Sequence, residues 1–117
     1  MKNKILLVDD DLSIRSLLTI LLEIEGFDVI KFHELSIESI ISTIKQEKPD
    51  VVLLDVHLEG INGIDILKTI RSDLSLSSIR IIMSSGNDLK EICINAGANE
   101  FLMKPYMPAD LLEFIKV

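Results

Sequence analysis

Residues 51–55 read Val-Val-Leu-Leu-Asp, four aliphatic side chains followed directly by a carboxylate. Two further runs share this design, since residues 5–8 lead into Asp9 and residues 101–103 lead into Lys104. Short aliphatic runs of this kind predict buried parallel strands. Because ligands bind beyond the carboxyl ends of parallel strands, we expect these charged groups to converge at one edge of a single sheet.

Helical patterns separate the aliphatic runs. Apolar residues recur at helical spacing after each run, Gly26 and Gly97 stand where helices should stop, and Pro108 stands where a last helix should start. We expect strands near residues 5–8, 29–32, 51–54, 79–83 and 101–103. This alternation predicts an α/β fold, a doubly wound five-stranded parallel sheet with helices on both faces. One domain is expected over residues 1–117, either standing alone or cut from a longer chain.

Composition excludes several classes of protein. The formal net charge of −7 argues against direct nucleic-acid binding. Cys93 is the only cysteine, which argues against a disulfide and favours a small buried residue on a helix. The two histidines, His33 and His57, lack a second ligand at metal-binding spacing. The first apolar run is too short for a signal peptide or a membrane span, so we expect a soluble, cytoplasmic protein without membrane contacts.

Three consecutive aspartates follow the first expected strand. Asp11 is the best candidate for the N-cap of the next helix, a role that one aspartate can fill. Asp9 and Asp10 remain, and with Asp55 they would place three carboxylates at one edge of the sheet. Carboxylates gathered in this way repel one another unless a cation lies among them, and Mg²⁺ prefers carboxylate, water and phosphate oxygens. The sequence therefore predicts an Mg²⁺ and phosphoryl site with Asp9, Asp10 and Asp55 as metal ligands.

The strand that ends in Asp55 has a second implication. A charged side chain at the end of a buried strand contributes nothing to the packing of the core. A carboxylate there can, however, act as a nucleophile toward phosphorus. Lys104 would supply a positive charge for phosphate oxygens. Ser84 and Ser85 close the run near residues 79–83, and one of the two hydroxyls is a candidate donor to a phosphoryl oxygen.

The order and spacing of these motifs match those of a known family. The matching stretches are residues 6–11, residues 53–56 with Gly60 and Gly63 downstream, residues 81–86, residues 96–98 and residues 101–106. Along its whole length the chain resembles the CheY-like receiver domain of two-component response regulators. The resemblance implies a flavodoxin-like sheet of order 2-1-3-4-5. It also implies a histidine kinase or phosphotransfer protein as phosphohistidine donor, and a downstream effector protein or domain as the recipient of the signal.

The resemblance also implies roles for individual residues. Asp55 is the implied phosphoacceptor, Asp10 the direct Mg²⁺ ligand and Asp9 a ligand acting largely through water. The backbone carbonyl of His57 is implied to complete the metal shell, and Lys104 to pair with the phosphoryl group. Such a domain is not an enzyme toward other molecules, because it catalyses only its own phosphorylation and dephosphorylation.

A conformational switch belongs to the same set of implications. Ser85 matches the family's switch hydroxyl better than Ser84, and Phe101 stands at the switch-aromatic position. In this mechanism the phosphoryl oxygens draw in the hydroxyl, and the aromatic ring rotates into the vacated space. This changes the face formed by the helix expected within residues 86–96, the strand near residues 101–103 and the helix expected to start at Pro108. The family also implies a cis bond between Lys104 and Pro105.

Two features depart from the family pattern. Glu59 stands where the family usually carries proline, which makes the loop after Asp55 more acidic. Only eleven residues, 86–96, separate Ser85 from Gly97. This is about three fewer than the family leads us to expect, close to one helical turn. We therefore expect the helix within residues 86–96 to be short or displaced.

Three other interpretations compete with a phosphorylated receiver. An Mg²⁺-dependent aspartyl phosphatase would normally carry a second aspartate where this chain has His57. A dinucleotide or flavin domain would need a Gly-x-Gly-x-x-Gly motif after the first strand, and none follows it. A receiver fold used only for docking would have no need of its full set of site residues. That set is complete here: Asp9, Asp10, Asp55, Ser85 and Lys104.

Overall fold

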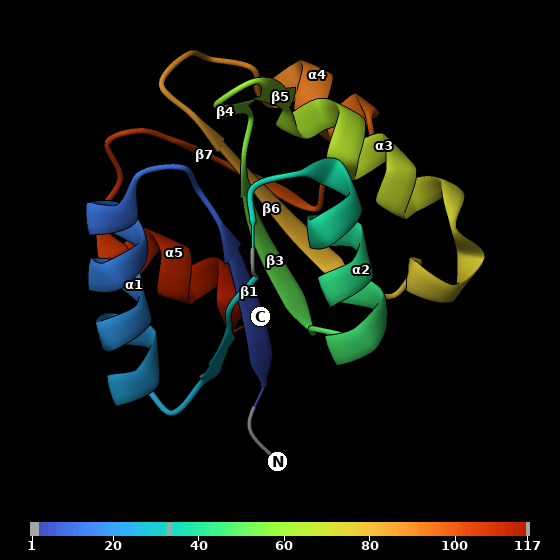
Figure 1. The fold of residues 1–117 in the computed structure, drawn as a ribbon. Helices are drawn as coiled ribbons and strands as arrows, with labels where there is room; N and C mark the ends of the chain where they lie inside the picture. Colours follow the sequence, from blue (N-terminus) through green and yellow to red (C-terminus); the bar gives the residue numbers. More distant parts are fainter. Residues whose placement is uncertain (1–2, 33, 117) are drawn as a thin grey trace.

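The computed structural model describes residues 3–32 and 34–116, in which strands and helices alternate (Figure 1). The strands are β1 (Lys4–Val8), β2 (Asp28–Ile30), β3 (Val51–Asp55), β4 (His57–Leu58), β5 (Ile61–Asn62), β6 (Arg80–Ser85) and β7 (Glu100–Met103). The helices are α1 (Leu12–Ile24), α2 (Ile37–Glu47), α3 (Gly63–Ser72), α4 (Lys90–Asn95) and α5 (Pro108–Ile115), with a 3₁₀ helix at Leu74–Leu76. Within the described ranges, no helix is long and apolar enough to cross a membrane.

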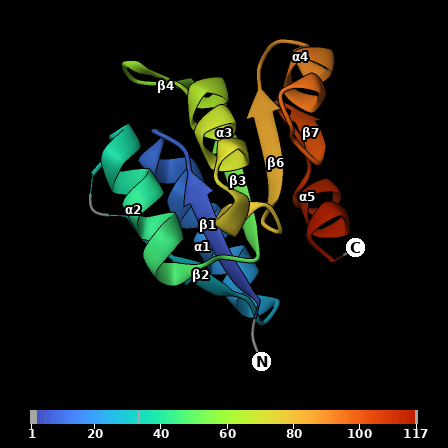
Figure 2. The same ribbon diagram turned by 90° about the vertical axis from the view of Figure 1, so that its right-hand side faces the viewer.

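A five-stranded parallel sheet forms the centre of the molecule, in the order β2-β1-β3-β6-β7. Counted along the chain without the small hairpin β4–β5, this is the order 2-1-3-4-5, so the prediction is confirmed. Helices α1 and α5 cover one face of the sheet, and α2, α3 and α4 cover the other (Figures 1 and 2). Since every pairing in this sheet is parallel, all five strands present their carboxyl ends at the same edge.

Aliphatic side chains fill the space on both faces of the sheet. Along β3, Val52 and Leu54 belong to the core under α2 and α3, whereas Val51 and Leu53 belong to the core under α1 and α5. Successive side chains of a strand point to opposite faces, so a strand covered on both faces must be apolar at every position. This double burial explains why the central strands read as continuous aliphatic runs.

Local capping fixes the start of two helices near the carboxyl edge of the sheet. Asp11 is the N-cap of α1, and its Oδ1 accepts hydrogen bonds from the backbone N–H groups of Ser13 at 2.9 Å and Ile14 at 3.2 Å. This confirms the role predicted for Asp11. Pro108 is the first residue of α5, also as predicted, because its fixed φ suits a first helical turn.

Several boundaries differ from the sequence-based expectations. β2 ends at Ile30, two residues before Phe32. The antiparallel hairpin of β4 and β5 was not predicted, because strands of two residues show no readable alternation. Leu17 and Ile92 contribute to apolar helical patterns, yet their exposed fractions are 58% and 55%. Those patterns therefore overestimate the buried faces of α1 and α4.

Helix α4, between β6 and β7, has only six residues, so the prediction that this helix is short or displaced is confirmed. Arg71, near the end of α3, anchors the turn after α4. Its guanidinium donates to the carbonyl oxygens of Gly97 and Ile79, each at 2.8 Å. It also donates to Oδ1 of Asn99 at 2.8 Å. The backbone of Gly97 has φ +113°, and a Cβ atom there would lie 2.7 Å from Cγ of Arg71, so this close packing requires glycine.

Candidate functional site

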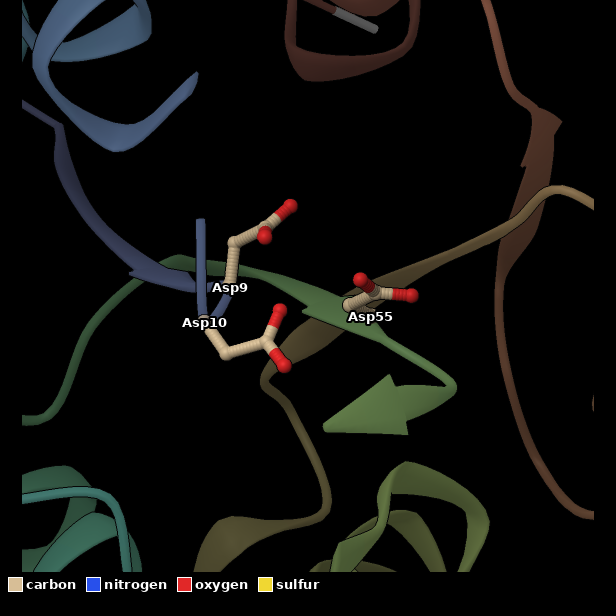
Figure 3. A group of neighbouring side chains, drawn as sticks. All are labelled: Asp9, Asp10 and Asp55. Carbon is tan, nitrogen blue, oxygen red and sulfur yellow. The ribbon is translucent and has the colours of Figure 1, made fainter. Parts of the chain in front are cut away.

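The carboxyl ends of β1 and β3 lie side by side in the sheet. The register pairs Val8 with Leu54, so the next residue of each chain segment, Asp9 or Asp55, lies at the same edge. Asp10 follows in the loop that leads to α1. Figure 3 shows the three aspartate side chains gathered around a common space beyond the two strands. The structure therefore brings together the three carboxylates that the sequence places at strand ends.

The three carboxylates form a compact set of oxygen donors. One oxygen from each of Asp9, Asp10 and Asp55 lies within 4.8 Å of the other two. Asp9 and Asp55 are buried, with 8% and 6% of each residue exposed, while Asp10 faces solvent. Negative charges held this close repel one another unless a cation offsets them. An oxygen-only donor set with one open side suits Mg²⁺, which keeps several water ligands, so these residues fit such an ion.

Lys104 joins the two buried carboxylates. Its Nζ donates to Oδ2 of Asp55 at 2.9 Å and to Oδ2 of Asp9 at 3.0 Å. Burial alone would lower the pKa of Lys104, but the hydrogen bonds and negative charges of Asp55 and Asp9 outweigh it and leave that pKa raised. The ammonium group therefore stays protonated at neutral pH, beside the carboxylate predicted to accept phosphate.

The main chain orients the same two carboxylates from the other side. Oδ1 of Asp9 accepts the backbone N–H of Asp11 at 2.9 Å, and Oδ1 of Asp55 accepts the backbone N–H of His57 at 3.2 Å. Each buried carboxylate thus has one oxygen on Lys104 and the other on a backbone amide. The role of the backbone carbonyl of His57 as a metal ligand stays a prediction. The other histidine of the sequence, His33, lies outside the described residues.

Ser84 and Ser85 end β6, and both are fully or almost fully buried. The register places Ser84 directly opposite Asp55, with Ser85 one residue further along the strand. Oγ of Ser85 accepts the backbone N–H of Asn87 at 3.1 Å, and its carbonyl oxygen accepts the backbone N–H of Lys104 at 2.8 Å. Ser85 is therefore tied to the loop that carries the lysine. The choice of Ser85 over Ser84 as switch hydroxyl stays a prediction.

Phe101 lies on β7, next to β6 in the sheet. It pairs with Met83, two residues before Ser85, and packs against the core under α2, α3 and α4. Residues two apart on a strand point to the same face, so Ser85 and Phe101 are diagonal neighbours on that face. Phe101 is only partly buried, and its switching role stays a prediction. The bond between Lys104 and Pro105 is cis, which confirms that implication of the resemblance.

A small cavity of about 170 Å³ opens at the rim of the carboxylate cluster. It is lined by Asp9, Asp10, Arg15, Phe32, Glu34, Leu35 and Glu59. Cζ of Arg15 lies 4.9 Å from the centre of the Phe32 ring, a cation–π contact that holds the guanidinium at the wall. No sequence motif predicts a role for Arg15 or Glu34. Helical spacing offered a signal for Arg15, because it follows the N-cap Asp11 by about one turn.

Fold and site together define a class of protein, a doubly wound α/β domain with three carboxylates and a lysine at the carboxyl edge of its parallel sheet. Residues 5–116 match the model of the family described as the response regulator receiver domain. The chain belongs to this family.

Individual relatives agree with this assignment. The chain is 33% identical over 116 residues to the DNA-binding response regulator MtrA of Mycolicibacterium smegmatis, with 99% of this chain and 50% of MtrA covered. It is 38% identical over 117 residues to the transcriptional regulatory protein CpxR of Escherichia coli K12, with 97% of this chain and 48% of CpxR covered. The chain thus spans about half the length of these curated relatives. The crystal structure of a CheY-like response regulator receiver domain protein from Methanospirillum hungatei shows 32% identity and a TM-score of 0.85, with 99% of this chain and 92% of that chain covered.

Proposed function

We propose that this domain accepts a phosphoryl group on Asp55, with Mg²⁺ bound by Asp9, Asp10 and Asp55, and passes the signal on through a change of its surface. The observation that carries the proposal is the position of Lys104, whose Nζ lies between Asp9 and Asp55 and within hydrogen-bond distance of both. A buried acidic cluster with one fixed cation needs further positive charge, and a hard divalent ion supplies it.

The chemistry follows from the residues at the strand ends. A carboxylate oxygen of Asp55 attacks phosphorus as the P–N bond of the donor phosphohistidine breaks, and the bonding electron pair leaves with the histidine nitrogen. The ammonium group of Lys104 is already in place for the oxygens of the arriving group. When bound, Mg²⁺ would neutralise charge on the transferred phosphoryl group. The backbone N–H of His57 donates to Oδ1 of Asp55 at 3.2 Å and so orients this carboxylate before the transfer.

The partners follow from the same proposal. A histidine kinase or a phosphotransfer protein supplies the phosphohistidine, and an effector protein or domain reads the face formed by α4, β7 and α5. MtrA and CpxR carry names of DNA-binding and transcriptional regulators, yet this chain matches only about half of either protein. With its net charge of −7 we propose that the receiver domain itself does not contact nucleic acid. The cytoplasmic location stays a prediction.

We further propose that the domain acts on no other substrate and catalyses only its own phosphorylation and dephosphorylation. An aspartyl phosphatase would normally carry a second aspartate two residues after the nucleophile, where this chain presents the exposed His57. The docking-only alternative would need no lysine between two buried carboxylates.

The decisive experiment is intact mass spectrometry of the chain after incubation with Mg²⁺ and a small phosphodonor. We expect one added phosphoryl group in the native chain and none in Asp55→Asn. Asp65→Asn is a matched control, because it makes the same substitution at an exposed aspartate in the first turn of α3. Stable phosphorylation that persists undiminished in Asp55→Asn would overturn the proposal.

A further inference from the structure

The cavity at the rim of the site carries more acidic side chains than metal binding requires. Glu34 and Glu59 line it together with Asp9 and Asp10, and both glutamates are exposed to solvent. Glu34 precedes α2 and Glu59 lies in the turn between β4 and β5, so two separate segments deliver these charges to the same opening. Within the described part of the chain, neither glutamate forms an ion pair.

The formal charges of the groups around this opening determine whether it attracts or repels an anion. The three aspartates carry three negative charges, and Lys104 with Arg15 carries two positive charges, which leaves one negative charge before metal binding. A bound divalent cation would change the net charge of these five residues and the ion to +1. The opening would then attract a negatively charged phosphate donor. Glu34 and Glu59 add two negative charges, so the net charge of the opening with its bound metal becomes −1.

We infer that Glu34 and Glu59 select the phosphodonor electrostatically. They disfavour free, doubly charged phosphodonors and favour a phosphoryl group carried on a positively charged protein surface. This inference rests on the proposed function and names the class of donor for the same site. Both side chains act at a distance through their charge, because like charges at a partly enclosed opening repel an approaching anion before contact. Arg15 lies against Phe32 in the wall of the same cavity, and its positive charge attracts an approaching anion.

The effect should be modest for each glutamate and dependent on salt. Coulomb's law in water gives about a two- to fivefold change in association rate for one charge acting on a dianion across an opening of this size. A donor with half the charge should feel about half the free-energy effect. High ionic strength should remove most of the difference, because the Debye length falls to about 3 Å at 1 M salt.

The test measures the second-order rate constant for phosphorylation of the native chain and of Glu59→Gln, Glu34→Gln and Arg15→Gln. The donors are acetyl phosphate, which carries about two negative charges near neutral pH, and phosphoramidate, whose protonated nitrogen leaves about one. Each glutamate variant should react about two- to fivefold faster with acetyl phosphate, with a smaller gain for phosphoramidate, and both gains should shrink at high salt. Arg15→Gln should react more slowly with acetyl phosphate.

Glu23→Gln is the matched control, since it removes the same charge from an exposed position in the last turn of α1, away from the carboxyl edge of the sheet. Its rate constants should equal those of the native chain. Equal rates in Glu59→Gln, Glu34→Gln and the native chain, or equal gains with both donors, would overturn the inference while leaving the proposed function intact. Failure of both donors to phosphorylate the native chain on Asp55 would overturn the proposed function, and this inference with it.

Discussion

Gly63 packs directly against the main chain of Asp55. A Cβ atom at position 63 would overlap the carbonyl oxygen of Asp55 and would lie 3.0 Å from its carbonyl carbon and from Cα of Val56. The N–H of Gly63 donates to the carbonyl oxygen of Val56 at 2.7 Å. The first residue of α3 therefore touches the end of β3, and only glycine permits this approach.

Gly63→Ala should destabilise the domain and shift the end of β3. The added methyl group meets backbone atoms that cannot rotate away, so we expect a loss of about 1–3 kcal/mol in urea unfolding, together with slower phosphorylation of Asp55. Gly86→Ala is the control, because Gly86 is exposed and nothing lies within 4 Å of a Cβ atom built there. A change in stability of the same size in both variants would show that the contact with Asp55 is not the cause.

Asp10→Asn should remove the response to Mg²⁺. Mg²⁺ that binds only the folded state raises the free energy of unfolding by mass action, by about 1.4 kcal/mol at ten times its Kd. Without Asp10 the cluster loses its solvent-facing ligand, so the increase in melting temperature with Mg²⁺ should vanish. In the absence of metal, the variant should melt at a higher temperature than the native chain, because one like charge has been removed.

Asp11→Asn is the matched control for that experiment. It changes the charge at the neighbouring position, yet asparagine also serves as an N-cap for α1. This variant should keep the native response to Mg²⁺. A native response in Asp10→Asn would show that Asp10 is not a ligand.

Arg71 should be essential for the order of the short segment around α4. Arg71→Gln removes donors from the carbonyl oxygens of Gly97 and Ile79, so we expect a loss of about 2–4 kcal/mol and faster amide exchange at residues 97–99. Arg71→Lys should recover little of it, since an ammonium group cannot reproduce the planar fork of donors. Lys68→Gln, on the exposed face of the same helix, should behave like the native chain. Native exchange rates in Arg71→Gln would exclude this anchoring role.

The sheet and its acidic edge could be predicted because their signals are local. Continuous aliphatic runs marked the buried strands, and each run ended at the residue that the fold brings to the carboxyl edge, as with Asp55 and Lys104. The anchoring role of Arg71 could not be predicted in the same way. An arginine near the end of a helix is usually interpreted as a solvated charge. The hydrogen-bond partner of Arg71, Gly97, lies 26 residues away in the sequence. The opening formed by Glu34 and Glu59 depends on loop positions, for which the sequence has no periodic pattern.

The last prediction concerns Ser85 and Phe101, the diagonal pair on β6 and β7. If the pair is the switch, Ser85→Ala and Phe101→Leu should both fold and accept phosphate on Asp55. In each variant, phosphorylation should then produce much smaller changes in amide exchange across residues 86–116 than in the native chain. The alternative role for Phe101 is that of an ordinary core aromatic, which would show mainly as lost stability. Because the ring is only partly buried, that loss should fall below the ~3–5 kcal/mol typical of removing a large buried aromatic side chain.

The variant Ser84→Ala tests which of the two serines, Ser84 or Ser85, supplies the switch hydroxyl. Ser84 lies directly opposite Asp55 in the sheet, while Ser85 lies one residue beyond and accepts the backbone N–H of Asn87. Successive residues of a strand point to opposite faces, so only Ser85 shares a face with Phe101. Ser84→Ala should therefore keep the full response of residues 86–116 to phosphorylation, and Ser85→Ala should lose most of it. The reverse result would move the switch to Ser84, and native responses in both serine variants and in Phe101→Leu would mean that the signal reaches α4 by another route.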